Sequence, residues 1–318
     1  GQPVVLTDEL ETVTRTDFDG TLAGSFTAHP KRHPETGELH AVVYYFAWDF
    51  IRYLVVGTDG RVRRRVDVPT GGHSPMIHDC AITESAVLLF DLPAHFDLDA
   101  AMAGASLPYR WNPEGPARVG VLPFEADAGA VQWCEVDPCF VFHPLNAFDR
   151  PDGTVQVDFA RHPSVFDTVV NGPAEGNPTL DRWILDPATG QAKEERLDDR
   201  AHEFPRHDER RIGKDSRFGY TIGFVGTEGP AYKHDLHTGT SEVHDFGPGR
   251  ASQEMVFVPR SDDSAEDDGW CMSYVHDAGT DTADVVILHA QDFTGDPVAT
   301  VHLPQRVPFG FHGNWVPS

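Results

Sequence analysis

The chain has 318 residues, a length that allows one large domain or two ordinary ones. Hydrophobic residues make up 40% of the sequence and charged residues 24%, so the chain can build a packed core and its composition does not indicate disorder. The formal net charge of −25 argues against a nucleic-acid partner, because phosphate binding needs a cationic face, and against long-range attraction to anionic lipid.

The four cysteines are too sparse for a disulfide scaffold, and Cys134 and Cys139 lack a second pair at zinc-finger spacing. We therefore expect buried free thiols and a location in the reducing cytoplasm. No apolar run reaches the roughly 18 residues of a transmembrane helix. The N-terminal residues show no basic region followed by an apolar one, so they do not predict a signal peptide.

Short runs rich in β-branched and aromatic residues, bounded by Gly, Pro, Asp and Asn, predict an almost entirely β structure. In chain order, we expect strands at 41–48 and 86–92, a short helix at 97–104, and further strands at 139–145, 218–225, 255–259, 270–275 and 284–290. Five turn sequences with Asp or Pro before a Gly recur between strand-like segments, as in hairpin loops. They lie at 33–39, 57–62, 150–155, 186–192 and 235–241.

Many short hairpin-linked strands in one chain indicate a β-propeller or a large β-sandwich. The spacing of the runs is irregular and no WD or kelch signature is present, so periodicity favours the propeller only modestly.

Histidine is frequent, at 17 of 318 residues. For most of these histidines, which lie beside turn or charged residues, we expect an exposed side chain. This group comprises His33, His40, His73, His95, His162, His202, His207, His234, His237, His244, His276, His289 and His302.

Four other histidines stand in apolar or small-residue settings. They are His29 in GSFTAHP, His78 in SPMIHDC, His143 in CFVFHPL and His312 in FGFHGNW. Their separations of 49, 65 and 169 residues exclude the H-E-x-x-H pattern and any local zinc finger. On spacing alone, each of these residues is more often a buried core histidine than a metal ligand.

The segments around these four histidines resemble the histidine blocks of the carotenoid cleavage oxygenase family, which includes carotenoid, apocarotenoid and lignostilbene dioxygenases and the retinal pigment epithelial membrane protein. The four segments are FTAHPKRHPETGEL, HSPMIHDCAITESAVLLFDLP, DPCFVFHPLNAFD and PFGFHGNWVP. Two further stretches, HEFPRHDERRIG and EMVFVPRSDDSAEDDGWCMSYVHD, also match family signatures. The resemblance runs from about residue 8 to the last residue, and the order of several motifs argues against chance.

The resemblance implies a seven-bladed β-propeller, with residues 1–318 forming one domain. Only 28 residues precede His29, fewer than family members carry, so we expect an N-terminally truncated member that lacks strands of the opening blades. In the family, the four block histidines bind one non-haem Fe(II). The resemblance therefore assigns the iron ligands to His29, His78, His143 and His312, a donor set that suits Fe(II).

Glutamates that accept the other ring N–H of the ligands form the second shell in this family, and the resemblance implies this role for Glu203 and Glu254. The alternative is that both form surface salt bridges with Arg206 and Arg260, which are close in sequence. Asp149 occupies a place where many relatives have Glu, and it could also orient a ligand.

The activity implied is oxidative cleavage of a conjugated C=C bond of a carotenoid or apocarotenoid by O2, giving aldehyde or ketone products. Alternatives are cleavage of a stilbene or phenylpropanoid olefin, isomerisation, a non-catalytic propeller that binds ligands, and a carboxylate-based sugar hydrolase. Aromatic residues beside the proposed ligands are candidates for an apolar substrate tunnel, or equally for the core: Phe26, Phe142, Phe148, Phe309 and Phe311. Lysines are few, so any membrane docking should be weak and hydrophobic, and we expect no obligate protein partner.

Overall fold

The computed structural model describes residues 1–168, 175–223, 229–308 and 310–316. Within these ranges the chain is almost entirely β-structure, which confirms the predicted class. The one α-helix described, α1 (Leu98–Met102), lies where the short helix was predicted, and the Asp97 carboxylate caps it by accepting a hydrogen bond from Ala100 N at 2.6 Å. None of the helices in the described part of the chain has the length and apolarity needed to cross a membrane.

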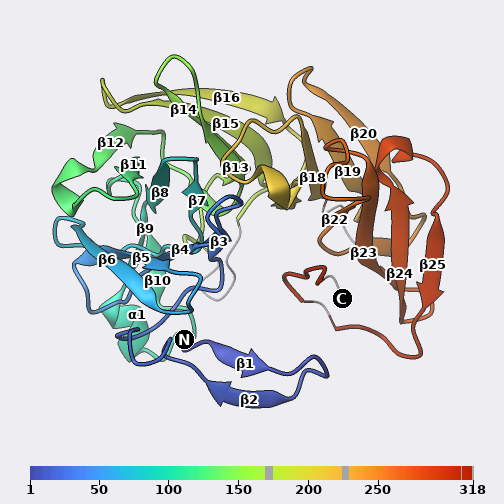
Figure 1. The fold of residues 1–318 in the computed structure, drawn as a ribbon, viewed down its shortest axis with the longest axis horizontal. Coiled ribbons are helices and arrows are strands. Elements are labelled where there is room, and N and C mark those ends of the chain that lie inside the picture. The colour runs from blue at the N-terminus through green and yellow to red at the C-terminus, as the bar shows by residue number, and fades with distance from the viewer. Residues whose placement is uncertain (169–174, 224–228, 309, 317–318) are drawn as a thin grey trace.

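Five antiparallel sheets follow one another along the chain in an arc, as successive blades of a propeller (Figure 1). The first contains β3 (Lys31–Arg32), β4 (Leu39–Val43), β5 (Phe50–Val56) and β6 (Val62–Pro69). The second contains β7 (Ala81–Ile82), β8 (Ala86–Asp91), β11 (Arg118–Pro123) and β12 (Gln132–Glu135). The third contains β13 (Phe140–Asp149), β14 (Val155–His162), β15 (Thr179–Asp186) and β16 (Gln191–Asp198).

The last two sheets continue the same up-and-down pattern. The fourth contains β17 (Glu203–Arg206), β18 (Phe218–Ile222), β19 (Ala231–Asp235) and β20 (Thr240–His244). The fifth contains β21 (Arg250–Ser252), β22 (Val256–Pro259), β23 (Gly269–Asp277), β24 (Thr282–His289) and β25 (Ala299–His302). The described residues thus hold five complete blades, fewer than the seven expected of a complete family ring.

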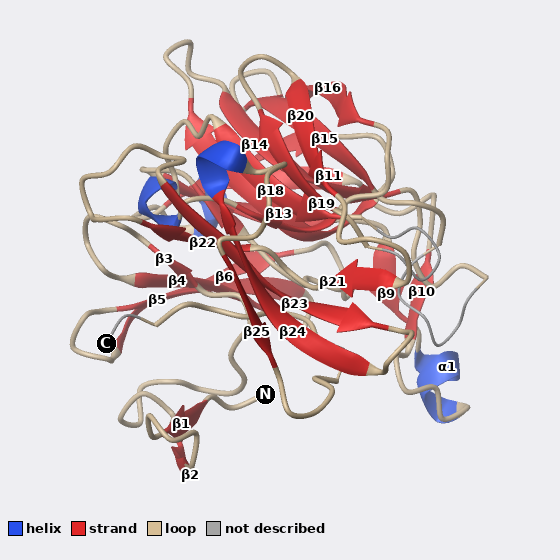
Figure 2. Cartoon of the chain, turned by 90° about the vertical axis from the view of Figure 1, so that its right-hand side faces the viewer, coloured by secondary structure: helices blue, strands red, loops and turns tan. Residues whose placement is uncertain are grey.

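Two separate hairpins and three 3-10 turns complete the structure described. The hairpins pair β1 (Val4–Leu6) with β2 (Thr12–Arg15) and β9 (Ala94–Phe96) with β10 (Tyr109–Trp111), and the turns are η1 (Ala128–Ala130), η2 (Glu209–Arg211) and η3 (Ala290–Asp292). Figure 2 shows α1 outside the sheets, next to β9 and β10. Helix α1 and the hairpin of β9 and β10 therefore form a projection that stands apart from the blades.

Each of the five predicted turn sequences forms a hairpin inside a blade. They connect β3 to β4, β5 to β6, β13 to β14, β15 to β16, and β19 to β20. Glycine is required because the turn backbone is left-handed, as at Gly60 (φ 76°) and Gly153 (φ 85°). Local turn chemistry therefore sets the strand order within these blades.

The hydrophobic cores lie between neighbouring blades. One cluster joins the second and third sheets around Phe140, Phe159 and Trp183, and another joins the fourth and fifth around Tyr220 and Leu288. Burying such large side chains on both facing sheets excludes water and fixes the blades relative to one another. As a result, the first strands β7, β13 and β17 pack side by side at the inner edges of their blades.

Candidate metal centre

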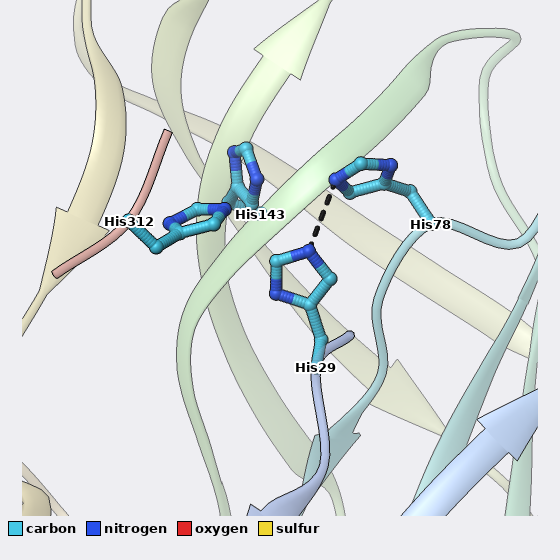
Figure 3. Close-up of side chains that lie close together, drawn as sticks. All are labelled: His29, His78, His143 and His312. Atoms are coloured by element: carbon cyan, nitrogen blue, oxygen red, sulfur yellow. Dashed lines mark hydrogen bonds between the residues drawn. The ribbon is translucent and has the colours of Figure 1, made fainter. Parts of the chain in front are cut away.

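The four histidines singled out in the sequence meet at one place, although 283 residues separate the first from the last (312 − 29). His29 lies directly before β3 and His78 before β7, His143 is on β13, and His312 is in the C-terminal segment (Figure 3). One donor nitrogen from each ring lies within 4.8 Å of the others. Converging first strands bring such distant residues together, as is usual in a propeller.

The arrangement of the rings matches a shared metal ion. The Nε2 atoms of His29 and His78 are 3.1 Å apart, as expected for neighbouring ligands about 2.1–2.2 Å from a common ion. Ring centroids of His143 and His312 are separated by 4.8 Å, with the planes inclined at 78°. Nearly perpendicular rings allow the nitrogens to approach one point without the rings overlapping.

Buried carboxylates hold the far sides of two rings. The Nδ1 atom of His143 is 2.7 Å from Glu203 Oε2, and the Nδ1 atom of His312 is 3.0 Å from Glu254 Oε1. A proton on Nδ1 fixes the tautomer in which Nε2 carries the lone pair needed for a metal. The glutamates therefore lie where the sequence analysis expected them, and the donor set fits a metal ion.

The Nε2 atom of His143 is buried and has no hydrogen-bond partner among the described residues. An unpaired buried polar atom costs about 1–3 kcal/mol, so its retention at this point favours a ligand that is not protein. Burial is the main cause that lowers the pKa of His29 and His78 to about 3, with Lys31 adding to it at His29 and His143 at His78. Both rings are consequently neutral at neutral pH, the form that binds metals.

The two glutamates remain ionised despite their burial. Desolvation would raise the pKa of Glu203, but the His143 and His162 imidazoles outweigh it and hold the pKa well below its usual range. Desolvation likewise opposes ionisation of Glu254, and His312 together with the Arg206 guanidinium lowers its pKa overall. Two carboxylates beside the four imidazoles thus provide negative charge suited to a divalent cation.

The Glu254–Arg206 pair differs from the surface salt bridge considered in the sequence analysis. Glu254 is buried, and Arg206 Nη1 lies 2.9 Å from Glu254 Oε2 and 3.0 Å from the Gly313 carbonyl oxygen. Arg206 Nη2 also donates to Asn314 Oδ1 at 2.9 Å. Arg206 therefore fastens the C-terminal segment that presents His312, while Arg260 pairs elsewhere, with Asp268.

A cavity of about 370 Å³ opens beside the histidines. Its walls include His29, His143 and His312 together with the polar residues Lys31, Arg206 and His207. Lys31 is neutralised by Asp79 at 2.8 Å, and Asp79 Oδ2 is also 3.8 Å from His29 Nδ1. This cavity leaves space for small ligands at the centre, but its lining is mixed rather than apolar.

The proposed tunnel phenylalanines have different surroundings. Phe142 contacts His78, with ring centroids 5.1 Å apart, and packs in the core between the second and third blades. Phe26 belongs to a core cluster of the first sheet, Phe148 is half-buried on β13, and Phe311 is 77% exposed. Phe309 lies outside the described residues. Among the described candidates, Phe142 alone has its ring against the histidine centre.

Two residues of the centre were missed in the sequence analysis. His162 Nε2 donates to Glu203 Oε1 at 2.7 Å, and the Phe204 ring lies 5.2 Å from His143 and 5.4 Å from His312 between centroids. Phe204 also has a left-handed backbone (φ 48°) at an irregularity of β17, a strained conformation that occurs at functional sites. His162 stands between Arg161 and Pro163, so no signal in the sequence could have identified it.

Other expectations about side chains need correction. Asp149 is exposed and accepts a hydrogen bond from Ser85 Oγ at 2.8 Å, so it orients no ligand. Seven of the thirteen histidines expected to be exposed are buried. They are His33, His40, His162, His202, His207, His234 and His244.

The fold and the site together define a β-propeller with four histidines, at the inner ends of its blades, that could hold a metal ion. The sequence profile of the retinal pigment epithelial membrane protein family matches residues 2–317, and the chain belongs to this family. A carotenoid cleavage oxygenase of Mycobacterium tuberculosis is 43% identical, over 98% of this chain and 72% of the relative. The carotenoid 9,10(9',10')-cleavage dioxygenase 1 of Pisum sativum is 32% identical, over 97% of this chain and 61% of the relative.

Solved structures agree with these relatives. The lignostilbene dioxygenase of Pseudomonas brassicacearum superposes with a TM-score of 0.89 at 28% identity, covering 97% of this chain and 70% of that one. Cobalt-substituted Synechocystis apocarotenoid oxygenase superposes with a TM-score of 0.88 at 26% identity, covering 100% and 71%. The propeller expectation is confirmed, and the chain is a dioxygenase of the carotenoid-cleavage type.

Proposed function

We propose that the chain is an Fe(II)-dependent dioxygenase that cleaves one conjugated C=C bond of a carotenoid or apocarotenoid. The alkene carbons are oxidised, O2 is reduced, and each oxygen atom forms one carbonyl group of the two products. The observation that carries this proposal is the convergence of four imidazoles, two of them backed by buried glutamates. Four neutral nitrogen donors suit Fe(II) and leave the ion two further positions.

When bound, Fe(II) would supply the activation of O2 next to the alkene. The chain's own residues prepare the site for this chemistry. Glu203 and Glu254 keep a proton on Nδ1 of the rings that they contact, so that Nε2 remains free. The rings of Phe142 and Phe204 pack against His78 and His143 and exclude water from that side of the centre.

The carotenoid substrate is supported by the mycobacterial relative, which has the higher identity of the two relatives described. The structural likeness to a lignostilbene dioxygenase keeps a stilbene-like olefin as the second candidate. A phenol would need a polar partner near the centre. Lys31 lines the cavity but is already paired with Asp79, so it is not a free partner for a phenol.

The direct test is anaerobic reconstitution with Fe(II), followed by addition of O2 and separate β-apocarotenals, stilbenes and isoeugenol. We expect about one iron per chain and aldehyde products from the apocarotenals, detected by liquid chromatography and mass spectrometry. Formation of aldehydes from the stilbenes instead of the apocarotenals would favour the second candidate. Full iron loading without product from any olefin would instead indicate a binding module.

We further propose weak membrane docking through the projection that carries α1. Leu98 is 65% exposed and Met102 is 81% exposed, and the Phe46 ring, itself 45% exposed, stacks on Phe96 at 4.9 Å. An exposed apolar group of this kind enters a lipid interface through the hydrophobic effect. Binding to phosphatidylcholine vesicles should therefore be insensitive to salt and be lost in a Leu98→Ser, Met102→Ser double variant.

A further inference from the structure

A second group of potential metal ligands lies outside the axial centre. His73 precedes β7, Asp91 ends β8, and His95 is the middle residue of β9. One donor atom of each lies within 4.8 Å of the others. A short backbone ladder fixes these segments, since Met76 N donates to the Ala94 carbonyl at 2.8 Å.

Asp91 is a fully buried carboxylate with its two oxygens in different surroundings. Arg118 Nε donates to Oδ2 at 2.9 Å, whereas Oδ1 is 2.8 Å from His73 Nε2. The guanidinium neutralises the carboxylate and fixes its orientation. Oδ1 is thereby directed towards the two imidazoles.

His95 carries the signal that points to a missing ligand. Its Nε2 atom is buried and has no hydrogen-bond partner in the described residues, although the ring lies 4.7 Å from His73 between centroids. The His95 ring also packs against Gly115, where a Cβ atom would come within 2.7 Å of Cε1. The chain thus holds the ring firmly while leaving a buried polar atom unpaired, which is energetically unfavourable.

We propose that His73, Asp91 and His95 bind a second divalent metal ion, of the kind that prefers imidazole ligands, such as Zn²⁺. His73 and His95 would each supply a ring nitrogen and Asp91 its Oδ1 atom, with water completing the coordination. If the His73 nitrogen facing Asp91 carries a proton, that proton is released on binding. Because Arg118 already neutralises Asp91, the site favours nitrogen-seeking ions over Mg²⁺ and Ca²⁺, which need carboxylate charge.

Such an ion would have a structural effect on the proposed docking projection. It would tie the segment before β7 and the end of β8 to β9, the strand from which the α1 projection departs. Structural metal sites stabilise segments that bury little apolar surface of their own. Metal binding should therefore protect residues 97–108 from proteolysis, whatever the axial centre does.

The test is titration of the iron-loaded protein with Zn²⁺ in excess Mg²⁺, followed by calorimetry and metal analysis. We expect one Zn²⁺ per chain in addition to the iron, and at least about tenfold weaker Zn²⁺ binding in His95→Ala and in His73→Ala, with the iron retained. His302→Ala is the matched control, because His302 also contacts a carboxylate, Asp284, at 2.7 Å but belongs to no such cluster.

Two results would overturn the proposal. One is the absence of a second equivalent of bound Zn²⁺ in the wild-type protein. The other is unchanged Zn²⁺ binding in both His95→Ala and His73→Ala. Iron content reports whether each variant folds, and since the His73 side chain is 17% exposed, His73→Ala should fold even where His95→Ala does not. If Zn²⁺ protects residues 97–108 from proteolysis in the wild type but not in the histidine variants, this result would support the site independently of the binding measurements.

Discussion

Two groups of histidines in the same molecule differ in how their ring nitrogens are paired. In the fourth blade, His234 Nε2 is 2.9 Å from Thr221 Oγ1 and its Nδ1 is 3.0 Å from Ser241 Oγ. His202 contacts the same threonine at 2.9 Å and Asp198 at 3.0 Å. Three of the four ring nitrogens of this pair are hydrogen-bonded to protein oxygens, and the fourth, His202 Nε2, lies 3.0 Å from Asp198 Oδ1 without hydrogen-bond geometry.

At the inner ends of the blades, His143 and His312 each have a glutamate on Nδ1, and the Nε2 atoms of His29 and His78 face each other at 3.1 Å. His143 has a carboxylate on Nδ1 and a buried Nε2 without a partner among the described residues. Burial lowers the pKa of histidines in both places, so burial alone does not identify a functional centre. What distinguishes the centre is the combination of a carboxylate-backed ring and an unpaired nitrogen that faces other rings.

The strongest test of this distinction is to remove one ring from each group. His143→Ala should abolish stoichiometric Fe(II) binding, because the ion loses a ligand and Glu203 loses the ring that it orients. Iron analysis after desalting gives the stoichiometry. The rise in melting temperature on adding Fe(II) should also disappear.

His234→Ala is the matched control for this experiment. It should destabilise the protein by about 1–3 kcal/mol, because Thr221 and Ser241 each lose a buried partner, yet leave one iron per chain. Loss of iron in His234→Ala, or full iron in His143→Ala, would contradict the proposed difference between the groups.

The second test changes the carboxylate and leaves the ligands in place. Glu203→Gln keeps the shape of the side chain but removes the charge that holds His143 and His162, so Fe(II) should bind about 10–100-fold more weakly. Competition with a chelator of known affinity measures this change. Glu266→Gln, at a carboxylate that instead accepts from Phe218 N at 2.8 Å, should bind iron as the wild type does.

The sequence could predict the parts of the fold that depend on local chemistry. The five turn sequences form hairpins because residues such as Gly37 and Gly239 adopt positive φ angles that other residues avoid. Strands β14 and β15 escaped prediction because they are not apolar runs. Asp158 and Arg182 form a bidentate ion pair between them at 2.7 and 2.8 Å, and this polar pair is buried in the sheet.

In the candidate centre, too, some residues could be predicted from the local sequence and others could not. The four histidines and two glutamates were predictable from the motifs around them, although the motifs alone did not place them in space. His162 was not predictable, because its neighbours Arg161 and Pro163 suggest a surface, and its partner Glu203 comes from another blade. A contact between residues of two different blades cannot be recognised from the sequence of either segment alone.

The third test uses pH on the metal-free protein. Burial, with His202 adding to it, lowers the pKa of His234 to about 3, whereas an unfolded chain has the ordinary value of about 6.5. Above about pH 6.5 the His234 side chain is neutral in both the folded and the unfolded state. Between about pH 6.5 and 3 it is protonated only in the unfolded state. The free energy of unfolding should therefore fall with decreasing pH, by about 1.4 kcal/mol per pH unit for this group.

Urea titrations at several pH values between about 7.5 and 4.5 measure this slope. His40 and His207, whose pKa values burial lowers to about 4 and about 3, add to it in the same direction. His234→Gln should remove one proton's share of the slope. His237→Gln, at an exposed position three residues away, should not change it, and equal slopes in the two variants would contradict the assignment.

The smallest effect is expected where a carboxylate lies beside the third histidine motif but outside the centre. Asp149 is exposed and bonded to Ser85, so Asp149→Asn should change the affinity for Fe(II) by less than about twofold. The chelator competition used for Glu203→Gln applies here without modification. If Asp149→Asn weakened Fe(II) binding as much as Glu203→Gln, direct contact with a histidine ring would not explain how a carboxylate affects the affinity. The contrast between the two histidine groups would then have no basis.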